Sequence, residues 1–403
     1  MEIGPILRAM SRNRIKVGLL VVEIAVTTAV VLNCLAMIQE QRARIGRPSG
    51  IDEANLMTVQ IRPFGQAFAD EGARREIVRR DLETLRAMPE VADASIMGPI
   101  PLQGGGSSGM FKALGGKDSD KVRAPIYNAD EHVLSTLGLE LVEGRALTET
   151  DQPLKNGPQI LNALVTRDFA EAVFPGQSPI GKMIDSGNPE YPDVIVGVVA
   201  RMVTPYGGGP MESRIVIYPS GPPGGAFISY VVRAKPGQLD QAMGRVDDVL
   251  LGLQNERLVD LTTMASVKGG GYALNAFVMR ILAVIAGLLL AVTALGIFGT
   301  TSFSVTQRTK QIGTRRALGA SQGEILRYFL IENSLVSTIG IGLGLIGAFA
   351  LNVLLVTQFA GSKLGPGLTL AGVLLLWLVG VAATVVPARR ASRLSPALAT
   401  RSV

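Results

Sequence analysis

The fold is decided by the stretch VTQRTKQIGTRRALGASQGEILRYFLIE, residues 305–332, a basic segment between two long apolar runs. Five of its residues are Lys or Arg, whereas Glu324 is the one acidic residue before Glu332. Helix-length apolar runs on both sides predict a short loop at a membrane surface. Because loops on the cytoplasmic side carry an excess of Lys and Arg, this charge predicts that the loop faces the cytoplasm.

Four apolar runs are long enough for a helix to cross a hydrocarbon core of ~30 Å. They cover residues 17–38, 276–305, 335–356 and 368–386. Basic residues lie outside the first and last runs, at Arg8, Arg12, Arg14, Lys16, Arg389, Arg390, Arg393 and Arg401. The loop between the last two runs carries only Lys363 as a charged residue. The sequence therefore predicts that both termini are cytoplasmic.

Charge divides along the same boundary. Residues 40–272 hold 24 Lys and Arg against 29 Asp and Glu, whereas the rest of the chain holds 15 against 4. The positive charge thus lies beside the membrane spans and not in a basic patch interleaved with aromatic residues, which argues against nucleic-acid binding. The single Cys34 falls inside the first span, so the external domain has no disulfide framework.

The external domain begins and ends with matching patterns. Strand, helix and strand are predicted over 56–63, 70–88 and 91–98, and again over 227–234, 239–254 and 258–261. Two such β-α-β units brought together make a split ferredoxin-like α+β sandwich. The residues between them form an inserted second lobe, which Gly and Pro clusters at 98–109 and 218–225 join to the first.

Residues with catalytic potential are few. GQSPIGKM, residues 176–183, matches the spacing of a phosphate-binding loop, but Met183 replaces the Ser or Thr that would hold Mg²⁺, and a helix precedes it where a strand is required. The single His132 is interpreted as a helix-surface residue. No Cys and His spacing indicates a metal site, and no nucleophile and base pair stands out.

Two groups of motifs carry a resemblance to a known family. FPGQSPIGKMI (174–184), preceded by LGLELVEGR (137–145) and followed by VIVGVVARM (194–202), resembles the periplasmic core domain of MacB-type ABC transporter permeases. QRTKQIGTRRALGASQGEIL (307–326) is similar to the cytoplasmic loop of the same MacB/FtsX-like family. The resemblance extends over essentially the whole chain.

The resemblance implies a permease subunit in a bacterial inner membrane that is not itself an enzyme. It implies that a separate ATPase binds ATP and Mg²⁺, so that this chain holds no cofactor or metal. It also implies that ATP hydrolysis moves the periplasmic domain of this chain and that this movement drives efflux. The other implied partners are a second permease, membrane lipid, and a periplasmic adaptor with an outer-membrane channel. Two alternatives stay open: a lipoprotein-releasing permease, and a membrane-anchored regulator that transmits ATPase motion to a periplasmic hydrolase.

The cytoplasmic loop is the expected site of coupling to the ATPase. Residues 311–318 and 322–330 are predicted to form short helices, with Gly313, Gly319 and Gly323 permitting the breaks. The residues assigned to coupling are Gln311, Ile312, Gly313, Arg315, Arg316, Leu318, Gly319 and Ile325. The family commonly has Glu at the positions of Gln307 and Gln311. This departure favours a heterodimer with a paralogous permease over a homodimer.

The spans and their junction carry further candidate residues. Gly340 and Gly344, with Gly347 one turn on, predict close helix packing. Glu23 is an ionisable group at membrane depth and is interpreted as a polar packing contact. Three glycines before the second span are expected to act as a hinge between the external domain and its helical stalk: Gly269, Gly270 and Gly271.

The predicted fold class is an α+β membrane protein, in which four transmembrane helices flank a large two-lobed extracytoplasmic domain placed between helices 1 and 2. The expected segments are an amphipathic cytoplasmic N-terminus (1–16), helix 1 (17–38), the periplasmic core domain (39–272, with one lobe at 52–98 and 226–262 and the inserted lobe at 99–225), stalk and helix 2 (273–305), coupling loop (306–332), helix 3 (333–357), helix 4 (368–388) and tail (389–403).

Overall fold

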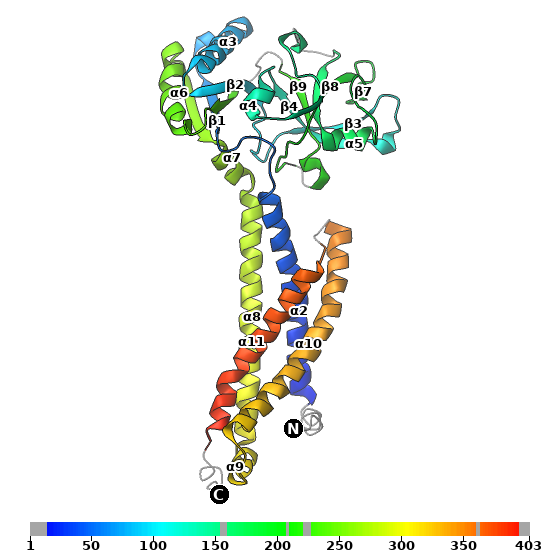
Figure 1. Cartoon of the computed structure of the whole chain (residues 1–403), viewed down its shortest axis with the longest axis vertical. Coiled ribbons are helices and arrows are strands. Elements are labelled where there is room, and N and C mark those ends of the chain that lie inside the picture. The colour runs from blue at the N-terminus through cyan, green and yellow to red at the C-terminus, as the bar shows by residue number, and fades with distance from the viewer. Residues whose placement is uncertain (1–13, 154–158, 207–208, 221–226, 360–362, 395–403) are drawn as a thin grey trace. The chain divides into compact units, whose positions relative to one another are not determined.

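The computed structural model describes residues 14–153, 159–206, 209–220, 227–359 and 363–394 (Figure 1). The chain divides into two compact units, a helical unit (1–46 with 275–403) and an external unit (47–274). Most of the expected N-terminal segment 1–16 and of the tail 389–403 lies outside the described residues.

The helical unit contains the four predicted spans. Its helices are α2 (Arg14–Ile45), α8 (Ala273–Gln307), α9 (Thr309–Ala317), α10 (Gln322–Phe359) and α11 (Pro366–Ser392). All except α9 are long and apolar enough to cross a membrane, and each contains one of the predicted apolar runs. Large hydrophobic side chains are exposed along them, such as Leu288, Ile346 and Leu378, as lipid-facing surfaces require.

Helix α8 is longer than a membrane span. Its 35 residues correspond to about 52 Å at 1.5 Å per residue, whereas the hydrocarbon core measures ~30 Å. The helix therefore continues outside the hydrocarbon region, as a stalk would.

The first lobe of the external unit has the predicted ferredoxin-like topology. Its elements are β1 (Leu56–Pro63), α3 (Glu71–Ala87), β2 (Val91–Gly98), β10 (Ile228–Ala234), α6 (Leu239–Leu253) and β11 (Arg257–Thr263). The strands pair antiparallel in the order β11-β1-β10-β2. One apolar core forms where α3 and α6 pack on this sheet, including Leu82, Val232 and Val246.

The inserted lobe is a small barrel. Its elements are β3 (Ser107–Ala113), β4 (Val122–Ala129), α4 (Val133–Leu137), β5 (Leu141–Gly144), β6 (Asn162–Thr166), α5 (Arg167–Val173), β7 (Met183–Asp185), β8 (Asp193–Val199) and β9 (Val216–Pro219). Pairing runs β4-β3-β7-β8-β6-β9, and β9 pairs with β4 to close the ring. Phe111 and Phe169 meet edge to face inside the lobe, with ring centroids 5.5 Å apart.

The two lobes share both a sheet and a core. Strand β2 of the first lobe pairs with β4 of the second through Met97 with Ala129 and Gly98 with Asn128. A continuous apolar cluster joins residues of both lobes, among them Leu164 of the barrel and Met264 of the short helix α7 (Met264–Gly271).

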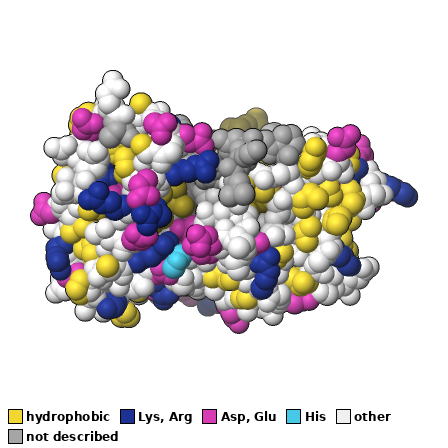
Figure 2. Space-filling model, turned by 90° about the horizontal axis from the view of Figure 1, so that it is seen from above, with side chains coloured by type: hydrophobic (Ala, Val, Ile, Leu, Met, Phe, Trp, Pro, Cys, Tyr) yellow, Lys and Arg dark blue, Asp and Glu magenta, His cyan; other side chains and the backbone are white. Residues whose placement is uncertain are grey.

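Acidic and basic side chains are mixed on the face shown in Figure 2, with hydrophobic side chains gathered toward one side.

A buried ion pair fixes α3 to the edge strand β11. Arg257 and Asp81 have side chains 0% and 1% exposed. A guanidinium nitrogen of Arg257 lies 3.0 Å from Oδ1 of Asp81, and the Tyr230 hydroxyl donates to Oδ2 of the same carboxylate at 2.9 Å. Removing either charge would leave the other buried without compensation.

We predict that Asp81→Ala destabilises the external unit by about 3 to 5 kcal/mol, because it leaves the Arg257 charge unpaired in the core. The melting temperature of the purified chain should fall by roughly 10 °C. The control is Arg75→Ala, which breaks the exposed Arg75–Glu71 pair and should cost less than about 1 kcal/mol. Equal losses in the two variants would contradict the role given to the buried pair.

Candidate functional site

The basic loop folds as one short helix between two long ones. Helix α9 ends at Ala317, and Gly319 turns the chain with a φ of +99°, a conformation that favours glycine. Ser321 and Glu324 then form a reciprocal cap: each side chain accepts a hydrogen bond from the other's backbone N–H, at 3.2 and 2.8 Å. The break expected at Gly319 is therefore present.

The second predicted short helix, 322–330, is not a separate element. It forms the start of α10, which continues without a break to Phe359. Gly313 and Gly323 lie within helices, so the breaks predicted there are wrong. No proline interrupts residues 322–359, so the helix that begins at the surface enters the membrane directly.

The apolar side chains that the sequence assigns to a partner are mostly used within the chain. Ile312 and Ile325 are 5% and 4% exposed, and they pack with Phe329 of α10 and with Ala388 and Ala391 of α11. Gly313 is also buried. Burial removes these three residues from the set that a partner could contact, and their role is to hold α9 against α10 and α11.

A smaller set of the predicted residues remains accessible. Leu318 is 83% exposed at the end of α9, and Gln311, Arg315 and Gly319 are also exposed. Leu318 is therefore the large apolar side chain that α9 presents outward.

Three basic side chains of this region are held by contacts within the chain. The Arg315 guanidinium lies 5.4 Å from the ring centroid of Tyr328, and Arg316 donates to the carbonyl of Ala320 at 3.1 Å. Arg308, which directly precedes α9, pairs with Glu332 of α10 at 3.0 Å. These contacts fix the orientation of the loop on α10.

The glycines of α10 lie against α2. A Cβ at Gly344 would stand 2.5 Å from Cβ of Thr28, and one at Gly340 would stand 2.8 Å from Cβ of Ile24. At Gly347 the nearest atom would be Cβ of Ala29, at 3.5 Å. The first two contacts are closer than any side chain allows, so the glycines set the distance between the two helices.

Glu23 of α2 faces α8. A Cβ at Gly296 would lie 2.6 Å from a carboxylate oxygen of Glu23, so the missing side chain makes room for this group. One turn along α2, the hydroxyls of Thr27 and Thr293 meet at 2.7 Å. Polar contacts thus join α2 to α8 as glycines join α2 to α10.

Sequence reasoning missed three asparagines that link the spans. Asn33 of α2 donates to the carbonyl of Ala348 at 3.1 Å, and Asn352 donates to Oδ1 of Asn33 at 3.0 Å. Asn333 donates to the carbonyl of Gly380 in α11 at 3.0 Å. The signal was an Asn inside the apolar runs 17–38 and 335–356 and another just before the second of these runs, because a polar side chain at membrane depth is expected to find a partner.

The three glycines of the expected hinge differ in their surroundings. They form the last turn of α7, and a Cβ at Gly269 or Gly270 would meet open space. At Gly271, however, it would lie 2.0 Å from the carbonyl oxygen of Leu102. Gly271 is therefore required for close packing of α7 on the loop at Leu102, and a hinge role remains a prediction for Gly269 and Gly270 alone.

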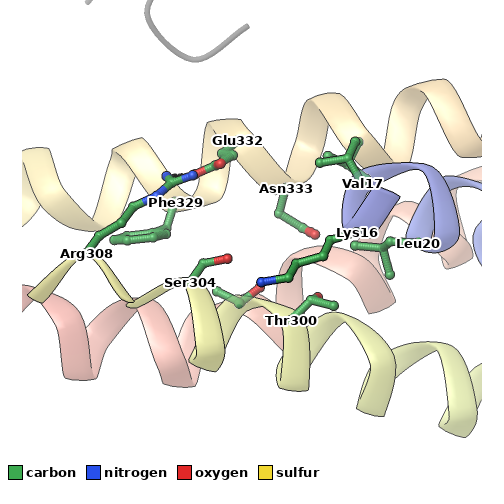
Figure 3. Close-up of a pocket in the computed structure, with 11 residues that line it drawn as sticks. Lys16, Val17, Leu20, Thr300, Ser304, Arg308, Phe329, Glu332 and Asn333 are labelled. Atoms are coloured by element: carbon green, nitrogen blue, oxygen red, sulfur yellow. Dashed lines mark hydrogen bonds and ion pairs between the residues drawn. The ribbon is translucent and has the colours of Figure 1, made fainter. Parts of the chain in front are cut away.

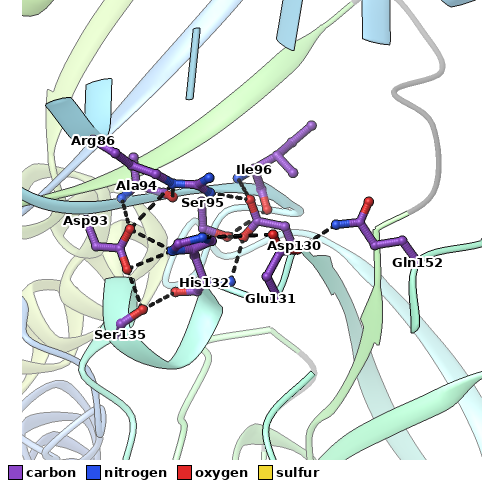
Figure 4. Close-up of polar contacts among 10 residues, drawn as sticks. All are labelled: Arg86, Asp93, Ala94, Ser95, Ile96, Asp130, Glu131, His132, Ser135 and Gln152. Carbon is purple, nitrogen blue, oxygen red and sulfur yellow. Dashed lines mark hydrogen bonds and ion pairs between the residues drawn. The ribbon is translucent and has the colours of Figure 1, made fainter. Parts of the chain in front are cut away.

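His132 belongs to a polar cluster in the external unit (Figure 4). It precedes α4, and its Nδ1 lies 2.9 Å from Oδ1 of Asp93 on β2. The hydroxyl of Ser135 donates to the other oxygen of the same carboxylate. Ser135 and His132 both bind Asp93, so the hydroxyl lies against the carboxylate and not against the imidazole.

A second carboxylate completes this cluster. Asp130 accepts from Arg86 of α3 at 2.8 Å and from the Ser95 hydroxyl at 2.6 Å (Figure 4). Burial raises the pKa of the Asp130 carboxyl, while the hydrogen bond from Ser95 and the charge of Arg86 act in the opposite direction. The cluster ties the inserted lobe to α3 and β2. Among the described residues, no three His, Cys, Asp or Glu side chains gather as a metal site.

Comparisons with known proteins follow the same division of the chain. A family described as MacB-like periplasmic core domain matches residues 21–249, and one described as FtsX-like permease C-terminal matches residues 283–396.

Two curated relatives match almost the whole of this chain. The macrolide export ATP-binding/permease protein MacB of Hahella chejuensis is 26% identical over 400 residues, which cover 96% of this chain and 58% of the relative. MacB 2 of Aeromonas hydrophila is 28% identical over 417 residues, covering 97% and 59%. The chain therefore spans less than two thirds of the length of these relatives.

Solved structures match the external part. The periplasmic region of MacB from Actinobacillus actinomycetemcomitans is 19% identical, covers 54% of this chain and 92% of that chain, and has a TM-score of 0.36. The extracellular domain of the ABC-type transporter YknZ from Gram-positive bacteria is 14% identical, covers 51% and 100%, and has a TM-score of 0.32.

We predict that Gly344→Val prevents α10 from packing on α2, because its side chain would overlap Thr28. The free energy of unfolding is expected to fall by about 1 to 3 kcal/mol. The measurements are the melting temperature and the yield of the purified protein, both of which should be lower. Gly342→Val on the same helix is the matched control, since a Cβ there meets nothing within 4 Å. If the two variants are equally stable, the glycine contact does not set the helix distance.

Proposed function

Because the chain belongs to the family of ABC transporter permeases that combine a MacB-like periplasmic core domain with an FtsX-like permease domain, we propose that it couples ATP hydrolysis to movement of its external unit. ATP and Mg²⁺ bind to an ATPase subunit, and this chain converts closure of that subunit into tilting of its spans. The movement of the external unit drives efflux.

The observation that carries this proposal is that α9 is packed firmly against α10 and α11. Ile312 and Ile325 lock it onto α10 and α11, while Leu318 points outward from its end. If α9 only covered its own subunit, Leu318 would remain exposed to water. A helix that inserts into a cleft on a partner presents such an anchor. Since α10 continues from the surface into the membrane, a push on α9 reaches the spans directly.

The charge of the chain supports one orientation in the membrane. The protein is a multi-pass membrane protein with a periplasmic domain, and the basic residues gather around α9 and beyond the ends of the first and last spans. By the positive-inside rule, α9 and both termini face the cytoplasm. The ATPase then meets α9 on the side where ATP is available.

Efflux is the direction of transport that the relatives favour. The two relatives named above are macrolide export proteins, and we extend export, though not the macrolide substrate, to this chain. A periplasmic adaptor and an outer-membrane channel would receive the exported molecule from the external unit.

We predict that Leu318→Asp abolishes stimulation of the ATPase by the permease. Burying an unpaired carboxylate in an apolar cleft costs several kcal/mol, so binding should weaken at least about a hundredfold. ATPase binding and ATP hydrolysis in reconstituted membranes measure the effect. The control is Leu258→Asp, a leucine 61% exposed on the external unit, which should fold and couple normally. Normal coupling in Leu318→Asp would rule out α9 as the docking element.

The composition of the permease pair gives a second prediction. Gln307 and Gln311 are exposed and leave this chain without the carboxylates that the family commonly offers to its ATPase. A paralogous permease could supply them, so we predict a heterodimer. Co-expression with the ATPase alone should give no stable, active complex, whereas adding the paralogue should restore one. An active assembly with two copies of this chain and no other permease would contradict the prediction.

A further inference from the structure

An open cavity lies among three helices at the end of the helical unit that carries α9. It opens to its surroundings and holds about 70 Å³ of free space, and it is bounded by the first turns of α2, the last turns of α8 and the start of α10 (Figure 3). Its lining includes the polar residues Lys16, Ser304 and Arg308 and the apolar residues Leu20 and Val336. None of these residues belongs to the outward surface of α9.

The charges around the cavity sum to a single positive charge. Arg308 is neutralised by Glu332 at 3.0 Å. Lys16 has no acidic partner among the described residues, and its ammonium lies 3.9 Å from the ring centroid of Phe303. Figure 3 shows its side chain reaching from α2 toward α8. The cavity is therefore charged to receive one anion of charge −1, with Lys16 as its counter-ion.

The charged residues of the cavity lie at a different membrane depth from Leu20 and Val336. Lys16 immediately precedes the apolar run that begins at Val17, and Arg308 directly follows α8, so both basic residues lie at the level of the lipid head groups. Leu20 lies one turn along α2 from Lys16, and Val336 lies one turn along α10 from Glu332, which is about 6 Å deeper in each case. The charged residues of the cavity thus lie at the head-group level, and its deeper part includes Leu20 and Val336 together with the hydroxyl of Thr300.

We propose that this cavity binds the head group of an anionic phospholipid. The phosphodiester, which carries one negative charge, lies beside Lys16 and accepts a hydrogen bond from Ser304, while the glycerol and the first acyl carbons lie against Leu20 and Val336. A free phosphate ion would contact Lys16 and Ser304 alone and would leave Leu20 and Val336 exposed to water. A lipid, which covers these apolar residues as well, is therefore the better fit.

Such a lipid would contact all three helices that bound the cavity. It would connect the start of α2 to α8 and α10 through Lys16, Ser304 and the Arg308–Glu332 pair. Arg308 directly precedes α9, so the lipid would lie near the start of this helix. The inference goes beyond the proposed function, because lipid retention can be measured without ATP, without an ATPase and without a transported substrate.

Native mass spectrometry of the full chain in detergent tests the proposal. After delipidation, the wild type is titrated with short-chain phosphatidylglycerol, short-chain phosphatidylcholine and inorganic phosphate. We expect one saturable phosphatidylglycerol per chain, bound about fivefold more tightly than phosphatidylcholine, as one membrane-surface Lys provides. Equal affinity for the two lipids would overturn the proposal, as would saturable phosphate binding without lipid retention.

Two variants locate the bound lipid. Lys16→Gln should abolish the preference for phosphatidylglycerol, whereas Lys363→Gln, which removes the same charge from a loop at the other end of the spans, should retain it. Ser304→Phe should block the cavity and reduce binding of both lipids at least about fivefold, whereas Thr306→Phe, exposed on the same helix and outside the cavity lining, should not. If the wild type prefers phosphatidylglycerol but neither Lys16→Gln nor Ser304→Phe changes its binding, the lipid lies elsewhere and the proposal fails.

Discussion

Close packing of α2 on α10 is the contact on which the rest of the structure depends. The two helices are separated in the sequence by the whole external unit, and in hydrocarbon the hydrophobic effect does not draw them together. Glycines at 340 and 344 let the backbones approach, and the amides of Asn33 and Asn352 hydrogen-bond across the same face. This contact places the first span in one bundle with the last three, so that both connections to the external unit start from a single body.

The attachment of α9 determines how a force from a partner could act on the helical unit. Helix α9 is attached by apolar burial to α10 and α11 and by ion pairing of Arg308 with Glu332. Within the external unit, the two lobes share a sheet, an apolar core and the polar cluster that contains Asp93 and Asp130. Each unit is therefore held together by its own contacts.

Local patterns predicted the fold well where neighbouring residues decide it. The alternation in LMTVQIRP and the amphipathic helix after it are visible in the sequence, and β1, α3 and β2 follow them closely. The barrel was not predicted, because its closure depends on β9 pairing with β4 across some ninety residues, and β7 and β9 have only three and four residues. Likewise, the apolarity of Ile312 and Ile325 indicates burial but does not say whether α11 or a partner buries them. Only the structure separates these two from Leu318.

The central claim is that α9 moves as one body with α10 and α11 when the ATPase acts. Electron paramagnetic resonance distances test it in the assembled complex, on a background in which Cys34, the single native cysteine, is replaced by Ala. Spin labels at Thr314 of α9 and Arg390 of α11, both exposed, report on the body itself, and labels at Thr314 and Leu258 report on its movement relative to the external unit. We predict that ATP with vanadate changes the second distance and leaves the first unchanged. A change in the distance between Thr314 and Arg390 as large as that between Thr314 and Leu258 would contradict the claim.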